Sequence, residues 1–102
     1  MYYRKLTKPT LTAVGVANQS IHLPFGCTNV MAEVIVGAGS GTTSVQFSGS
    51  NDNTNFTNIG SAITSTNRAV TLNADNQVFL YYRASTTIAT NTKETTVNFY
   101  CN

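Results

Sequence analysis

The fold is decided by residues 45–60, which read VQFSGSNDNTNFTNIG. The first part alternates the apolar residues Val45 and Phe47 with polar residues, as a half-buried strand does. A run of Gly, Ser, Asn, Asp and Thr follows, and apolar residues resume at Phe56 and Ile59. Gly tolerates positive φ, and Asn and Asp bond their own backbone, so the run favours a tight turn. The stretch therefore predicts a β-hairpin in an antiparallel β protein.

The turn of this hairpin carries the predicted structural residues. Gly49 and Ser50 open the turn, Asp52 accepts backbone N–H groups across it, and Phe56 anchors it over the core. Residues 51–55 also resemble a calcium loop, but calcium sites use several carboxylates and this loop has one. We therefore expect turn chemistry here and no metal site.

Short strand candidates with turn signals between them recur along the chain. The strongest is residues 30–36, where Val and Ala alternate on one face, and its other face is also partly apolar. This strand is predicted to be central or covered by a partner. Residues 95–101 form the last strand, with Val97, Phe99 and Cys101 inward. The other candidates are residues 11–16, 20–23, 43–48, 55–60 with an extension over 62–65, 68–72 and 78–84.

The pattern predicts an all-β protein: a single antiparallel β-sandwich of jelly-roll or immunoglobulin-like type, with about eight strands. A chain of 102 residues holds one domain, which we assign to residues 11–102. Residues 1–10 read as an extended N-terminal arm. Two interpretations of the arm stay open: a frayed terminus or edge strand, and a segment that contacts a neighbouring subunit through Tyr2, Tyr3, Arg4 and Lys5.

Charge is sparse, since Asp, Glu, Lys and Arg make up 10% of the residues against an average of about 25%. The net charge of +2 is too small for a protein that binds nucleic acid mainly through phosphates. No stretch approaches the roughly 20 apolar residues of a membrane helix, and the N-terminus has no signal-peptide pattern. We expect no nucleic-acid or membrane partner, and synthesis in a cytoplasm. A surface with few charges favours a fixed part of a larger assembly.

The cysteines are Cys27 and Cys101. A disulfide between them requires Cα atoms within about 7 Å, and folding in a cytoplasm disfavours it. We therefore expect two free thiols. One His and no CxxC pair do not make a structural zinc site.

Catalytic chemistry finds no support in the sequence. His22 alternates with Ile21 and Leu23 and is expected to be a structural or surface histidine. No two carboxylates are fixed near each other by local spacing, so acid–base catalysis of the glycosidase type is not indicated. The glycine loop at residues 37–41 lacks the lysine of a phosphate loop. We expect no catalytic residue and no cofactor.

Phe79, Tyr81 and Arg83 are predicted to share the outward face of one strand, with Leu80 and Tyr82 on the inward face. Two interpretations stay open for Arg83: stacking on a cross-strand aromatic ring in solvent, or a contact between subunits. Monomers usually avoid a patch of three such large groups.

Residues 43–101 resemble a small β-sandwich domain of tailed-bacteriophage virion proteins. The resemblance is carried by FSGSNDNTNF at residues 47–56, Ile59-Gly60, Val70-Thr71-Leu72, FLYYRA at residues 79–84, and the last strand. The chain departs from the pattern in having Phe56 where Trp is common. Sugar-binding sandwich domains share the Gly-Ser-x-Asp turn and the aromatic residue that follows it.

The resemblance implies a structural protein, most specifically a capsid cement or decoration protein that binds the major capsid protein and stabilises the shell. It also implies a homo-oligomer, with a trimer favoured, on the capsid surface of a virion assembled in a bacterial host. A small tail, neck or fibre-base component is one alternative. A glycan-binding module or adhesin is another.

Overall fold

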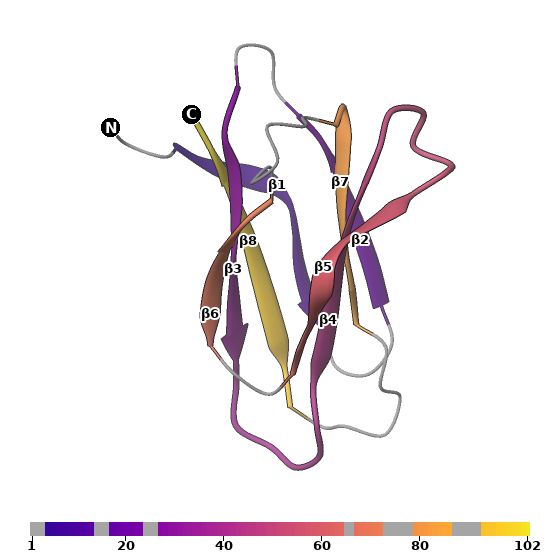
Figure 1. The fold of residues 1–102 in the computed structure, drawn as a ribbon. Helices are drawn as coiled ribbons and strands as arrows, with labels where there is room; N and C mark the ends of the chain where they lie inside the picture. The colour runs from indigo at the N-terminus through magenta and orange to yellow at the C-terminus, as the bar shows by residue number, and fades with distance from the viewer. Residues whose placement is uncertain (1–3, 14–16, 24–26, 65–66, 73–78, 87–92) are drawn as a thin grey trace.

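The computed structural model describes residues 4–13, 17–23, 27–64, 67–72, 79–86 and 93–102, with side chains from residue 17 onward. Within these ranges the chain forms two antiparallel four-stranded sheets and no helix (Figure 1). One sheet has the order β1 (Arg4–Ala13), β8 (Thr95–Cys101), β3 (Val30–Val36), β6 (Arg68–Thr71). The other has the order β2 (Ala17–His22), β7 (Tyr81–Thr86), β4 (Ser44–Ser50), β5 (Thr57–Thr64).

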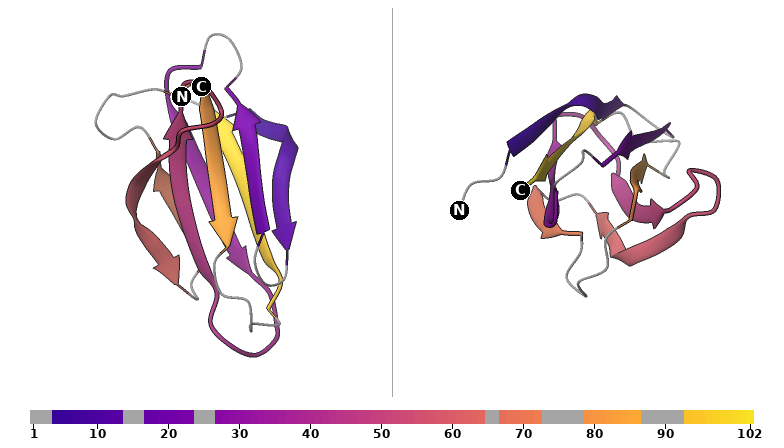
Figure 2. Two further views of the ribbon diagram at one scale, coloured as in Figure 1. Left: turned by 90° about the vertical axis from the view of Figure 1, so that its right-hand side faces the viewer. Right: turned by 90° about the horizontal axis from the view of Figure 1, so that it is seen from above.

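The core lies between the two sheets, which Figure 2 shows as separate layers when the molecule is seen from above. Strands β3 and β8 have the predicted bounds, and Val34, Val97 and Phe99 on them are at most 1% exposed. The ring of Phe99 meets the ring of Phe47 from the opposite sheet edge-on, with centroids 6.1 Å apart. The predicted inward positions of Val45 and Phe47, which are at most 2% exposed, are also confirmed.

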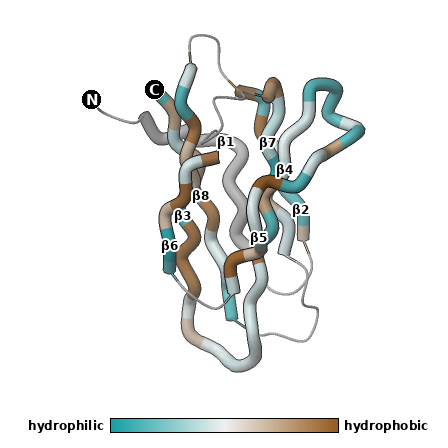
Figure 3. Tube along the Cα trace, in the orientation of Figure 1, coloured by the Kyte–Doolittle hydropathy of each residue, from teal (hydrophilic) through white to brown (hydrophobic). Residues whose placement is uncertain are grey.

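Strand β3 is central, because β8 pairs with one side of it and β6 with the other. In Figure 3 it is a mostly hydrophobic segment, in contrast to the hydrophilic turn between β4 and β5. On its outward face, Glu33 accepts a hydrogen bond of 3.1 Å from the hydroxyl of Tyr100. Desolvation and the neighbouring Glu33 together raise the pKa of Tyr100.

The hairpin of β4 and β5 contains an irregularity. Val45 pairs with Ile63 and Phe47 pairs with Ile59, so β5 has extra residues between two successive inward positions of β4. Gly60 lies there with φ of 65°, which a residue without Cβ adopts easily. The side-chain amide of Gln46 donates to the carbonyls of Ile59 and Gly60 at 3.4 and 3.2 Å. The irregularity of β5 therefore lies after Ile59.

The prediction of two free thiols is wrong, because Cys27 and Cys101 form a disulfide with Cα atoms 5.7 Å apart. The reason lies in the pairing of β3 with β8. Val30 at the start of β3 is the register partner of Cys101 at the end of β8. Because Cys27 is three residues before Val30, this pairing brings Cys27 close to Cys101. Backbone hydrogen bonds between Asn29 and Asn102 close the same corner.

Strand β1 includes most of the segment that was predicted to be an arm. Its backbone pairs with β8 at Arg4–Leu6 and again at Leu11–Ala13, on the edge of the sheet. This arrangement corresponds to the edge-strand alternative for residues 4–6. A contact between the N-terminal segment and another subunit stays a prediction.

Candidate functional site

The candidate site is the outward face of the sheet β2-β7-β4-β5. Strand register aligns its side chains in rows across the sheet. Arg83 on β7 pairs with Ser20 on β2 and Ser48 on β4, and Ser48 pairs with Asn58 on β5. The next row contains His22, Tyr81 and Ser50.

Arg83 occupies the middle of this face. Its guanidinium carbon lies 4.1 Å from the centroid of the Phe56 ring, which is cation–π geometry. Its Nε donates to Ser48 Oγ at 3.2 Å. Arginine has five N–H donors, and those on the terminal nitrogens have no acceptor among the described residues. The half-buried side chain of Arg83 is thus held by two contacts, while most of its donors remain available to a partner.

Tyr81 and His22 form a second aromatic contact in the next row of the face. Their rings are tilted at 59° with centroids 5.0 Å apart. His22 is exposed and Tyr81 is half-buried. The pair places two rings that each carry a polar group beside the stacked Arg83 and Phe56.

The turn between β4 and β5 positions Phe56. Ser50 Oγ accepts the N–H groups of Asp52 and Asn53 and donates to Asp52 Oδ1. The same carboxylate oxygen accepts the N–H groups of Thr54 and Asn55 at 2.9 and 2.8 Å. Asn53 adopts the left-handed conformation that Asn tolerates, with φ of 59°. Asp52 therefore organises the turn through backbone N–H groups, and the chain re-enters the sheet just after Phe56.

These hydrogen bonds hold the pKa of Asp52 well below its usual range, chiefly through the N–H groups of Asn55 and Thr54 and then the Ser50 hydroxyl. A carboxyl whose folded pKa is depressed stabilises the fold above its unfolded pKa of about 4 and loses that effect as pH falls toward the folded value. We expect the stability difference between wild type and Asp52→Asn to shrink from pH 6 to pH 3. An NMR titration of the Asp52 carboxyl with its midpoint near pH 4 would contradict this account.

The expectation that Phe56 anchors the core is wrong. Phe56 is half-buried, lies outside the core cluster and stacks with Arg83 on the outward face. The turn residues return the chain to the sheet on the side of Ser48, away from the inward side chains of β4.

The predicted grouping of Phe79 with Tyr81 and Arg83 is also wrong. Strand β7 begins at Tyr81, so strict alternation does not extend back to Phe79 and Leu80. Phe79 packs against the core and meets the ring of Tyr82 edge-on, whereas Leu80 is 52% exposed. A Cβ added to Gly49 would lie 2.2 Å from a ring carbon of Phe79, so the glycine makes room for this ring.

The other predicted contact residues are not brought to this face by any described contact. Arg4 and Lys5 lie on β1 of the other sheet, where only the backbone is described, and Tyr2 and Tyr3 lie outside the described residues. Arg68 received no functional prediction, although its alternation with Val70 and Leu72 indicates an inward position.

The described residues bring no three metal-ligating side chains together. Of the carboxylates, Asp52 is bound in its turn and Glu33 accepts from Tyr100. His22 contacts the Tyr81 ring. This face therefore offers stacking and hydrogen bonding to a partner.

In addition, no helix in the described ranges has the length and apolar character required to cross a membrane.

No protein-family model, curated protein or solved structure matches the chain. The resemblance to bacteriophage virion proteins therefore stays a prediction.

Proposed function

We propose that this chain is a non-enzymatic structural protein that binds a macromolecular partner through the outward face of β2-β7-β4-β5. The observation that carries the proposal is the arrangement of Arg83. The side chain is held over Phe56 and by Ser48, and its terminal N–H donors have no acceptor among the described residues. Arg, Tyr and Phe are enriched in protein interfaces, and rigid anchors of this kind lose little conformational entropy on binding.

The fold type that we propose is a jelly-roll β-sandwich. Its support is the nested antiparallel pairing of β1 with β8, β2 with β7, β3 with β6, and β4 with β5. A jelly roll is a long antiparallel ribbon wrapped into two four-stranded sheets, and it occurs in viral capsid and lectin domains. The fold alone does not choose between these functions.

The partner that we propose is the major capsid protein of a bacteriophage, and the role is that of a capsid cement protein, as a homo-trimer on the capsid surface. The low proportion of charged residues supports a fixed place in an assembly. The disulfide supports a location outside a reducing cytoplasm, since disulfides persist on virion surfaces. Binding to the assembled shell, and not to its free subunits, would stabilise the shell by mass action.

The test is re-binding of the purified chain to capsids that were assembled without it. We expect wild type to co-sediment with the capsids and to saturate at a fixed stoichiometry. Arg83→Glu reverses the charge of the proposed anchor and should weaken this binding at least tenfold, because the stacked guanidinium and its donors are lost. Equal binding of wild type and Arg83→Glu would contradict the role of the face.

Arg68→Glu is the matched control, because it makes the same change of charge on a strand of the other sheet. It should bind capsids as wild type does. Sedimentation equilibrium of the free chain adds a second readout, for which we expect a trimer. A monomer that binds oligosaccharides on a glycan array, and does not bind capsids, would favour the glycan-binding alternative. In an image of the native particle, density for the chain on the tail or neck would favour a tail, neck or fibre-base component.

A further inference from the structure

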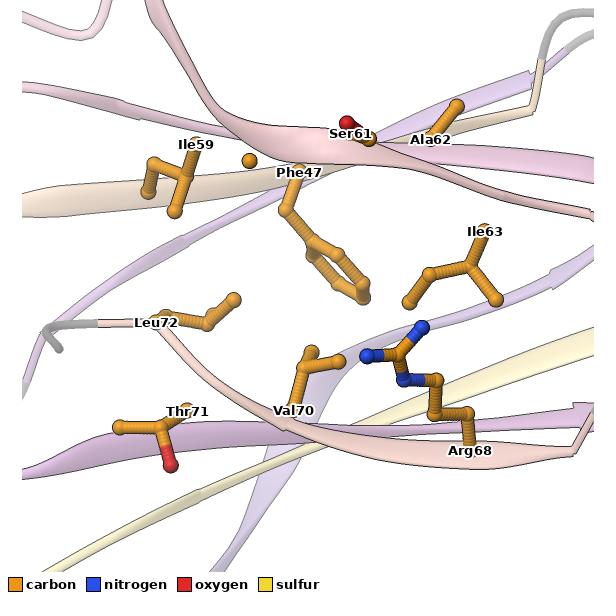
Figure 4. A pocket seen from close by; sticks show the side chains of 10 residues that line it. Phe47, Ile59, Ser61, Ala62, Ile63, Arg68, Val70, Thr71 and Leu72 are labelled. Carbon is orange, nitrogen blue, oxygen red and sulfur yellow. The ribbon is translucent and has the colours of Figure 1, made fainter.

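The two sheets leave a cavity of about 400 Å³ between β5 and β6, the edge strands that lie on the same side of the molecule. Small-molecule sites typically measure about 300–1,000 Å³. The cavity is open at one side, and Figure 4 shows the side chains that converge on it.

Apolar side chains form one part of the cavity lining. Phe47, Ile63 and Leu72 are at most 6% exposed, and their side chains point into the space between β5 and β6 (Figure 4). Ile59 and Val70, which are half-buried, also line the cavity, and Ser61, Thr71 and Arg68 add polar groups to the lining. The lining therefore offers apolar surface to an aliphatic or aromatic group and polar groups to a polar end of the same molecule.

Arg68 is the charged residue of this lining. It is the register partner of Val34, which is 1% exposed, and it alternates with the inward Val70 on β6. Its side chain is therefore on the inward side of an edge strand, and Figure 4 shows the guanidinium directed into the cavity between Ile63 and Val70. Among the described residues no carboxylate or other acceptor lies within bonding distance of this guanidinium.

We propose that this cavity binds a small amphipathic carboxylate, with its apolar tail between the sheets and its carboxylate on Arg68. A guanidinium presents paired N–H donors in the geometry that a carboxylate accepts, and such charge-assisted pairs are stronger than neutral hydrogen bonds. The apolar side chains of the lining supply affinity for the tail of the ligand. The guanidinium at the mouth sets the orientation of the ligand and selects a ligand with a negative charge. The site uses neither Arg83 nor the outward face, so it is independent of the proposed partner surface.

A different role is known for an inward-pointing charge on an edge strand, because it discourages pairing with the edge of another sheet. That role requires no cavity beside the charge. Here the cation is aimed at a cavity of ligand size that is lined in part by the buried side chains of Phe47, Ile63 and Leu72, and a ligand accounts for the cation and the cavity together.

The test is a titration of the full chain with octanoate, followed by the methyl NMR signals of Ile59, Ile63, Val70 and Leu72. We expect saturable shifts in these signals. Octanol carries the same tail without the charge and acetate carries the charge without the tail, so each should bind at least about tenfold more weakly. Octylammonium, which has the opposite charge, should bind more weakly still.

Arg68→Gln should weaken octanoate binding about tenfold or more, and Arg68→Lys should retain part of the affinity because it keeps the charge. Arg83→Gln, with the same net charge as Arg68→Gln, is the matched control and should bind as wild type does. Three outcomes would each overturn the proposal: no saturable shift with octanoate, equal affinity for octanol, and wild-type affinity of Arg68→Gln. If Arg68→Gln self-associates but keeps wild-type affinity, the residue protects the edge and the ligand proposal is wrong.

Discussion

Phe99→Ala is expected to lower the free energy of unfolding by about 3–5 kcal/mol, the usual cost of removing a fully buried aromatic ring. Phe99 is 0% exposed on the central part of the sheet β1-β8-β3-β6 and meets Phe47 of the other sheet. Its removal would leave a cavity between two rigid layers that cannot collapse freely. Urea unfolding followed by circular dichroism measures the loss.

Phe56→Ala is the matched control for this prediction, because it makes the same change on the outward face of the other sheet. It removes a half-buried ring and one cation–π contact, so the expected cost is about 1 kcal/mol. A loss for Phe56→Ala as large as that for Phe99→Ala would place Phe56 in the core after all. That result would remove the outward patch on which the proposed function depends.

Loss of the disulfide is expected to lower the free energy of unfolding by about 4 kcal/mol. The bond joins residues separated by 74 positions, so it restricts most of the unfolded chain. Urea unfolding of the Cys27→Ala/Cys101→Ala double variant measures this effect without added reductant. Wild type in excess reductant should approach the stability of the double variant.

A single variant, Cys27→Ala, provides the control for side-chain packing, since Cys101 is 0% exposed and stays in place. It should lose nearly as much stability as the double variant. Unchanged stability of wild type on reduction would contradict this account, because a bond that restricts the unfolded chain must stabilise the fold.

Much of the fold could be predicted from local pattern. Val97 and Phe99 alternate with more polar residues in β8, and Val30, Ala32 and Val34 recur at every second position in β3, so period-two burial predicted the bounds and inward faces of both strands. Local chemistry also indicated the role of Asp52. The carboxylate of an aspartate in a turn accepts backbone N–H groups of the same turn, and here Asp52 accepts from Thr54 N–H and from the Ser50 hydroxyl. These features depend on residues near one another in the sequence.

The errors arose where distant segments meet. Cys27 and Cys101 are adjacent because β3 pairs with β8, and strand order cannot be read from alternation. Phe56 was assigned to the core because it is aromatic, but the turn delivers it to the outward side beside Arg83. A role for Arg68 could not be predicted from the sequence, because it depends on the cavity formed with β5, a strand of the other sheet.

The most direct measurement for the proposed function is an electron cryomicroscopy reconstruction of the native particle whose genome encodes this chain. We predict three-fold-related copies of the two-sheet domain on the capsid lattice, with Arg83 and Phe56 buried against the capsid subunit. A shell without this density, or copies whose face around Arg83 points to solvent, would contradict the account.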